Sequence, residues 1–419
     1  MATETDRPGM TNRPGMTDRS RMTERPRMRR RLAAGVAIAG AAALVVSACA
    51  APEPIETLVP MPLPIIEVER SAAPEGELPV DLQSSLQAAL DGVMADHEVT
   101  GAVAGVWVPG EGSWTTAAGL ADIETGLPAS TGMQWPLRSL TKSVTVTLVL
   151  QLADEGIISL DDTLDQYVEG VTNGDRITIR ELAGMQAGIA DYTAQAFLDD
   201  FTDDPDRLYT LDELNAYVLD QPELFPPGEG KVYSNASINL LGRVVEVATG
   251  LDFATALDQR ILTPLGQTGT DYLVDVADWT APHPIGYRLL DGVQQPQPDN
   301  FSIFGPAGGL VGTLEDTRAW VDALATGEFL TPATQAQRMS GAPLQQGPPY
   351  DLYALGMGET GGYWGHNGEG FGFTAAMFHN PDTGVSIVVF MNASDTPNKD
   401  HPADLAFRAL AAALAEAGR

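Results

Sequence analysis

The chain has 419 residues, of which 44% are hydrophobic and 19% are charged. This composition is typical of a globular protein and excludes a wholly disordered one. The formal net charge is −32, although residues 1–48 carry nine arginines against four acidic residues. The rest of the chain is therefore strongly acidic. Because it would repel nucleic-acid phosphates, we expect no nucleic-acid partner.

Residues 1–48 are predicted to be a disordered basic start followed by a signal peptide. A six-residue unit repeats over 5–28, and the chain from Met28 then reads MRRRLAAGVAIAGAAALVVSAC. A basic stretch, an apolar stretch and small residues follow in the order of a secretory signal. The Val-Ser-Ala-Cys window resembles a bacterial lipoprotein signal, so we expect lipidation of Cys49, the single cysteine. The uncharged stretch 32–51 leaves an uncleaved membrane helix as the alternative. Either anchor places the body outside the cytoplasmic membrane.

A proline-rich tether is predicted over 49–80, ahead of a folded domain over 81–419. Seven prolines between positions 50 and 80 favour a stiff, extended segment. The apolar spacing of 80–97 indicates an amphipathic helix. Residues 101–108 and 112–122 are predicted to form two strands joined by a short Pro-Gly-Glu turn.

The middle of the domain is predicted to be mostly helical, over about 140–295. Strands return late, where 371–380 and 385–394 flank a Pro-Asp-Thr-Gly turn, which is a hairpin signal. Residues 401–418 close the chain as a helix. Strands at both ends with helices between them predict an α+β fold: an antiparallel sheet flanked by helices, with an inserted helical subdomain.

Within LRSLTKSVTVTLVLQL (137–152), Ser139 and Lys142 stand three residues apart at the start of an apolar run. Positions i and i+3 share one side of a helix, so the two side chains can touch. A serine hydroxyl needs a neighbouring base, and burial lowers the pKa of a lysine enough to provide one. The free N–H at the helix start can also face an oxyanion. Because the motif is short, a coincidental pair on a solvated helix face remains the alternative.

Two later segments favour the catalytic interpretation. FPPGEGKVYSNASINLLG (225–242) places Tyr233 and Asn235 between a Pro/Gly turn and a helix, where helix capping is the simpler explanation. GGYWGHNGEGFGF (361–373) carries His366 among glycines that let a backbone approach a ligand closely. Read alone, His366 is an ordinary surface-loop histidine.

Taken together and in this order, these segments resemble the penicillin-binding-protein and serine β-lactamase superfamily. The branch is that of class C β-lactamases and D-alanyl-D-alanine carboxypeptidases, and Ser-x-x-Lys is its signature element. The resemblance covers 81–419. It is strongest over SLTKSVTVTLVLQLADEGIISLDDTLDQYV and LFPPGEGKVYSNASINLLGRVVEVATG. It implies a β-lactamase/transpeptidase-like α+β fold.

The resemblance also implies a role for each matching residue. Ser139 would be the acylated nucleophile, with Lys142 and Tyr233 sharing proton transfer. Asn235 would bind the substrate's amide carbonyl and help to orient Lys142. The backbone N–H groups of Ser139 and Glu369 would form the oxyanion hole.

On the late strand, His366, Asn367 and Gly368 stand where the family has Lys/His-Thr-Gly, and would border the substrate. Asn367 replaces a threonine often used to hold a substrate carboxylate. Glu369 adds a negative charge that disfavours a carboxylate nearby. Where relatives often read His-Thr-Ser-Gly, this chain has MQAG (185–188).

The expected function is an extracytoplasmic serine hydrolase that forms an acyl-enzyme on an amide or ester. A D-alanyl-D-alanine carboxypeptidase-like role on peptidoglycan peptides comes first, a promiscuous esterase second and a β-lactamase third. A penicillin-type binding or sensor domain with little turnover is the alternative of another class. The mechanism needs no metal or cofactor, and the five histidines show no metal-ligand spacing.

Overall fold

The computed structural model describes residues 68–290, 292–394 and 400–419. The predicted signal peptide, Cys49 and the first part of the predicted tether lie outside the described residues. The signal, the lipid anchor and the domain bounds therefore stay predictions. No helix in the described ranges has the length and apolarity that a membrane crossing requires.

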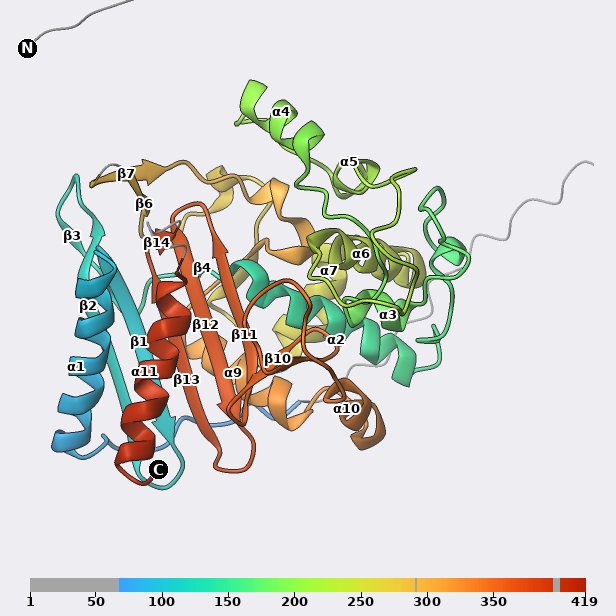
Figure 1. Cartoon of the computed structure of the whole chain (residues 1–419). Helices are drawn as coiled ribbons and strands as arrows, with labels where there is room; N and C mark the ends of the chain where they lie inside the picture. Colours follow the sequence, from blue (N-terminus) through green and yellow to red (C-terminus); the bar gives the residue numbers. More distant parts are fainter. Residues whose placement is uncertain (1–67, 291, 395–399) are drawn as a thin grey trace, which may run out of the picture. The chain divides into compact units, whose positions relative to one another are not determined.

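The largest sheet has eight strands in the order β3-β2-β1-β13-β12-β11-β10-β9, and neighbouring strands run antiparallel (Figure 1). Its strands are β1 (Gly101–Val108), β2 (Gly112–Asp122), β3 (Leu127–Pro128), β9 (Leu352–Tyr353), β10 (Gly358–Thr360), β11 (Tyr363–Gly370), β12 (Phe373–Asn380) and β13 (Val385–Met391). Because β1 pairs with β13, segments almost 300 residues apart in the sequence meet at its middle. This confirms the predicted α+β fold with an antiparallel sheet.

Helices cover both faces of this sheet. Helix α1 (Val80–Asp96) packs against α11 (Pro402–Glu416), and α11 lies across β12 and β13 (Figure 1). Helix α9 (Leu314–Thr326) contacts β12 and β13 from the other face. Every residue of β1 and of β13 is buried, as burial on both faces demands.

The late hairpin forms as the turn sequence predicts. β12 and β13 pair from Thr374–Met391 to Asn380–Val385, and the turn between them ends at Gly384. Gly384 has φ +73°, a backbone conformation that glycine adopts without steric cost. The second strand is shorter than expected, because β14 (Ala393–Ser394) leaves to pair with β6 (Gly286–Leu290).

The segment between β3 and β9 carries most of the helices and contributes strands to two small sheets, one of which also takes in β14 from the end of the chain. The sheets are β14-β6-β7, with β7 (Val293–Gln297), and β4-β8-β5, with β4 (Trp135–Pro136), β8 (Leu310–Gly312) and β5 (Thr270–Tyr272). The helices are α2 (Thr141–Asp154), α3 (Ile179–Ala183), α4 (Gln195–Asp203), α5 (Leu211–Ala216), α6 (Asn235–Thr249), α7 (Phe253–Leu257), α8 (Thr263–Leu265) and α10 (Pro332–Arg338).

Helix α2 is buried over twelve successive residues, from Thr141 to Leu152. It packs against α6, so no solvated face remains. This explains why its sequence is apolar on several sides instead of amphipathic. Arg138–Leu140 form a short 3-10 turn ahead of the helix, so Ser139 lies just before its first residue, Thr141.

Residues in the last part of the predicted tether contact the folded body. Arg70 pairs with Asp316 on α9 at 2.7 Å, and Ser71 donates to Asp322 on the same helix at 2.8 Å. Leu78 donates its N–H to the Ser113 carbonyl of β2. Residues 70–78 are therefore held against the folded body by hydrogen bonds and an ion pair.

Candidate active site

Ser139 lies in the 3-10 turn that leads into α2, and Lys142 lies in the first turn of that helix. A hydrogen bond of 2.9 Å joins Lys142 Nζ and Ser139 Oγ. The chain enters this turn through Arg138, whose φ of +52° is rare for a residue with a side chain. The predicted contact between hydroxyl and amine is present in the folded chain.

Lys142 is fully buried, and its amine donates a second hydrogen bond to the Ala307 carbonyl at 2.8 Å. Burial lowers the pKa of Lys142 to about 7, while the negative charge of Asp191 acts in the opposite direction. A buried ammonium loses its hydration, which favours the neutral amine. Near neutral pH, a large share of Lys142 is therefore able to accept a proton.

Tyr233 precedes α6, and the centroid of its ring lies 5.1 Å from Lys142 Nζ. Its hydroxyl is buried and has no direct hydrogen-bond partner among the described residues. Burial raises the pKa of Tyr233 well above 10, Tyr353 and Tyr350 add to the shift, and Ser139 opposes it. The phenol therefore keeps its proton at neutral pH, which suits a proton relay and not a standing phenolate base.

β11 passes directly beside the nucleophile. A β-carbon added to Gly368 would lie 2.5 Å from the Leu137 carbonyl oxygen and 2.9 Å from the Ser139 nitrogen. This close approach needs glycine at position 368. It brings the backbone at Gly368 and Glu369 alongside Ser139, where an oxyanion hole made from Ser139 and Glu369 was expected.

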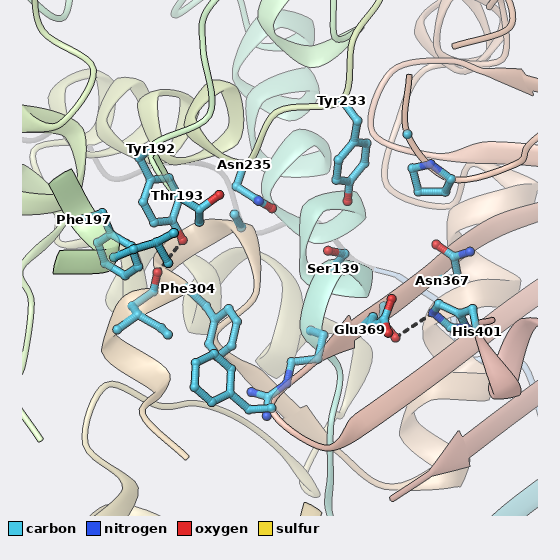
Figure 2. A pocket seen from close by; sticks show the side chains of 18 of the residues that line it. Ser139, Tyr192, Thr193, Phe197, Tyr233, Asn235, Phe304, Asn367, Glu369 and His401 are labelled. Atoms are coloured by element: carbon cyan, nitrogen blue, oxygen red, sulfur yellow. Dashed lines mark hydrogen bonds between the residues drawn. The ribbon is translucent and has the colours of Figure 1, made fainter. Parts of the chain in front are cut away.

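Asn235 opens α6 and points toward the same cavity (Figure 2). Its backbone N–H donates to Asp191 Oδ2 at 2.7 Å and its side-chain amide donates to the same atom at 3.0 Å. Asn235 was expected to orient Lys142, but Lys142 is held by the Ala307 carbonyl, and Asn235 is held by Asp191. The amide oxygen of Asn235 would be the acceptor available to a substrate N–H.

His366, expected to bind substrate, is fully buried and does not line the cavity. Its ring lies between Tyr350 and Tyr353, with Nδ1 3.2 Å and Nε2 3.3 Å from their hydroxyls. Burial lowers the pKa of His366 to about 3, Lys142 adds to the shift and the Asn367 backbone opposes it. His366 is therefore neutral, and its ring is enclosed by the tyrosines, outside the cavity. This corrects the expectation that its side chain binds the substrate.

Asn367 does line the cavity, as expected. Its side-chain oxygen accepts a 2.7 Å hydrogen bond from the Tyr350 hydroxyl, which in turn accepts one of 2.9 Å from the Asn367 N–H. The side-chain amide reaches Asp404 on α11 at 3.4 Å. These contacts fix the orientation of the amide that replaces the family's threonine.

Sequence reasoning missed Asp191 and His401. Asp191 has no motif around it and becomes visible only through its bonds to Asn235. His401 caps α11: its Nδ1 accepts from the Asp404 N–H, so its Nε2–H donates to the Gly368 carbonyl at 2.9 Å. His401 thereby fixes the strand beside the nucleophile and lines the cavity. Its distance of 262 positions from Ser139 hides this relationship in the sequence.

The cavity has a volume of about 600 Å³ and two different walls. Figure 2 shows Tyr233, Asn367, Glu369 and His401 near Ser139, with Tyr192, Phe197 and Phe304 on another side. The described part of the chain contains no group of three or more His, Cys, Asp or Glu side chains placed to hold a metal ion. The groups gathered around Ser139 are those of acyl transfer by a serine nucleophile.

Comparison with known proteins gives the same assignment. A family described as Beta-lactamase matches residues 86–413. Esterase EstB of Burkholderia gladioli is 26% identical over 72% of this chain and 81% of its own length. A D-aminopeptidase of Brucella anthropi is 26% identical over 74% of this chain, which spans 59% of that relative. The crystal structure of a D-stereospecific amidohydrolase from Streptomyces sp. matches with a TM-score of 0.68 and 26% identity, covering 78% of this chain and 98% of that one.

Proposed function

The chain belongs to the beta-lactamase family of serine hydrolases acting on amides or esters, and we propose that it forms its acyl-enzyme on Ser139. One observation carries the proposal. Lys142 Nζ lies 2.9 Å from Ser139 Oγ, and burial lowers the pKa of Lys142 to about 7. A nucleophile and a base of this kind are therefore in contact at neutral pH.

In the proposed first step, Ser139 Oγ attacks the substrate carbonyl carbon while its proton passes to the neutral amine of Lys142. The negative charge that develops on the carbonyl oxygen is met by the backbone N–H groups of Ser139 and Glu369. Collapse breaks the bond to the leaving group. Tyr233 gives its proton to that group and regains one from Lys142, which is neutral again.

In the second step, a water molecule attacks the acyl-enzyme and loses its proton to the same Lys142 and Tyr233 pair. The bond between the acyl carbon and Ser139 Oγ breaks, and the serine recovers a proton. Both steps use one set of groups in opposite directions, as microscopic reversibility requires. The product is the free acid, and the enzyme returns to its starting state.

The expected D-alanyl-D-alanine carboxypeptidase-like activity needs a place for a terminal carboxylate. Arg138 is the one arginine among the described residues that line the cavity, and it would be the natural partner for a carboxylate. Its guanidinium already pairs with Asp299 at 2.6 Å and donates to the Gly370 carbonyl. Glu369 adds a negative charge to the same cavity. A neutral ester or amide therefore ranks ahead of a D-alanine peptide and of a β-lactam, because both of these carry a carboxylate.

The test is a comparison of kcat/KM for p-nitrophenyl acetate, a D-alanyl-D-alanine peptide and a chromogenic cephalosporin. We expect the ester to be hydrolysed best and Ser139→Ala to abolish its hydrolysis. Preference for the peptide would restore the carboxypeptidase assignment. Acylation without turnover of any of the three would favour a penicillin-type sensor.

We also propose that the protein works outside the cytoplasmic membrane, tethered through lipidated Cys49. The support is the sequence of the signal segment ahead of Cys49. Expression of the full chain in a bacterium grown with an alkyne fatty acid should label the wild-type protein and leave Cys49→Ser unlabelled. Equal labelling of the two proteins would remove the lipid anchor from the proposal.

A further inference from the structure

A continuous row of aromatic rings forms one side of the cavity and is here called the aromatic wall. It consists of Phe197 and Phe201 on α4, Phe371 in the turn between β11 and β12, and Phe304. Phe197 and Phe201 stack with centroids 5.9 Å apart, and Phe371 meets both Phe201 and Phe304 edge-on at 5.6 Å. The wall therefore runs from α4 to the neighbourhood of the nucleophile.

The wall leaves apolar surface open to the cavity. Leu198 stands beside Phe197 on α4, lines the same cavity and is 45% exposed. Phe201, Phe304 and Phe371 are only partly buried, although each packs against the core. Apolar surface gathered in a concave site is the usual mark of a ligand-binding region, since a ligand gains by covering it.

The wall carries no net charge close to the nucleophile. Arg138 lies beneath it, with the guanidinium carbon 4.5 Å from the centroid of Phe304. The charge of Arg138 is neutralised by Asp299, and both side chains are buried. A neutral, apolar group therefore fits this side of the cavity better than a charged one.

The position of Tyr233 indicates which part of the substrate meets the wall. In Figure 2 the Tyr233 hydroxyl points to Ser139 from one side, while Phe197 and Phe304 lie on another side, away from Tyr233. If Tyr233 protonates the leaving group, that group leaves on the side of Tyr233. The acyl group, bonded to the same carbon, then extends toward the aromatic wall.

We propose that the aromatic wall is an acyl-group subsite, and that the preferred substrates are esters or amides of arylacetic or medium-chain aliphatic acids. This inference rests on the proposed function of Ser139. It adds that α4, through Leu198 and Phe201, sets the specificity of the enzyme. A cavity of about 600 Å³ has room for such a group beside the reacting carbonyl.

The experiment measures kcat/KM for p-nitrophenyl esters from acetate to octanoate and for the phenylacetate ester. With one leaving group throughout, kcat/KM should rise about two- to fourfold for each methylene until the wall is covered. Leu198→Ala should lower the octanoate-to-acetate ratio about three- to tenfold. Phe201→Leu, which keeps an apolar side chain, should lower the phenylacetate-to-octanoate ratio.

Leu127→Ala is the matched control, because Leu127 is 44% exposed and lies on β3, outside the cavity. Its ester ratios should equal those of the wild type. A flat dependence on acyl length would overturn the subsite, even if Ser139 is acylated. A dependence that appears only when the alcohol of an acetate ester is lengthened would assign the wall to the leaving group and also overturn it. Failure of the proposed function would be distinct: no ester would acylate Ser139.

Discussion

Lys142 Nζ lies 2.9 Å from Ser139 Oγ although the α-helix that carries the lysine begins only at Thr141. The serine belongs to a 3-10 turn entered through a residue with φ +52°. The contact therefore depends on an irregular turn held in place by its surroundings as well as on helical spacing. Strained backbone of this kind persists where the neighbouring structure fixes it.

Removal of the base should slow acylation more than any other change outside Ser139 itself. Lys142→Ala is expected to lower the acylation rate by about two orders of magnitude or more, the usual scale for a lost general base. Lys142→Arg should not rescue it, because a guanidinium stays protonated. Stopped-flow release of p-nitrophenol measures the rate. Lys231→Ala, which removes a buried lysine outside the cavity, should retain it; an unchanged rate in Lys142→Ala would exclude the amine from the mechanism.

The pH dependence of kcat/KM should follow the protonation of Lys142. Its pKa is lowered from 10.5 to about 7, and the neutral amine is the active form, so kcat/KM should rise with pH through about 7 and then level off. The pKa of His366 is lowered to about 3, so His366 is neutral throughout this range. The same limb should persist in His366→Gln. A limb that disappears in that variant would assign the titration to His366.

A single methyl group at position 368 should damage the site. Gly368→Ala places a carbon 2.5 Å from the Leu137 carbonyl oxygen and 2.9 Å from the Ser139 nitrogen, so the turn or the strand must shift. A displacement of about 1 Å at a reacting group can cost about 100-fold in rate, and we expect a loss of that order in kcat/KM. Gly132→Ala meets no atom within 4 Å and serves as the control. Wild-type kinetics in Gly368→Ala would show that the strand tolerates the shift.

Arg138 should contribute to the stability of the fold as well as to the placement of the turn that carries Ser139. Arg138→Leu leaves Asp299 buried without its cation, and breaking a buried pair in this way costs about 3–5 kcal/mol in the free energy of unfolding. Urea denaturation measures the loss. The double variant Arg138→Leu with Asp299→Leu should recover part of it, because no unpaired charge remains. A double variant as unstable as the single one would point to the aromatic contacts of Arg138 instead.

Local patterns were sufficient for the elements that bear the chemistry. The spacing of Ser139 and Lys142 and the Pro/Gly turn before Tyr233 are written within short stretches of sequence. The hairpin β12–β13 follows from its turn residues, whereas β11 was expected because the resemblance to the family implies a strand at 366–368. In each case, the determining contacts are close in the sequence, or the motif itself carries the information.

The rest depends on packing between distant segments. Nothing near Asp191 or His401 in the sequence indicates that they hold Asn235 and Gly368. His366 matched a motif position, yet Tyr350 and Tyr353 enclose its ring. Its full burial outside the cavity was therefore not predictable. The aromatic wall likewise assembles from three separate segments of the chain.

The central claim is that Ser139 carries the acyl group. Its most direct test is intact-mass analysis, followed by peptide mapping, after the purified protein is mixed with p-nitrophenyl octanoate and quenched in acid within the turnover time. The account predicts one added octanoyl group on the peptide that contains Ser139, and its absence in Ser139→Ala. An acyl group on any other residue, or an adduct that survives in Ser139→Ala, would contradict it.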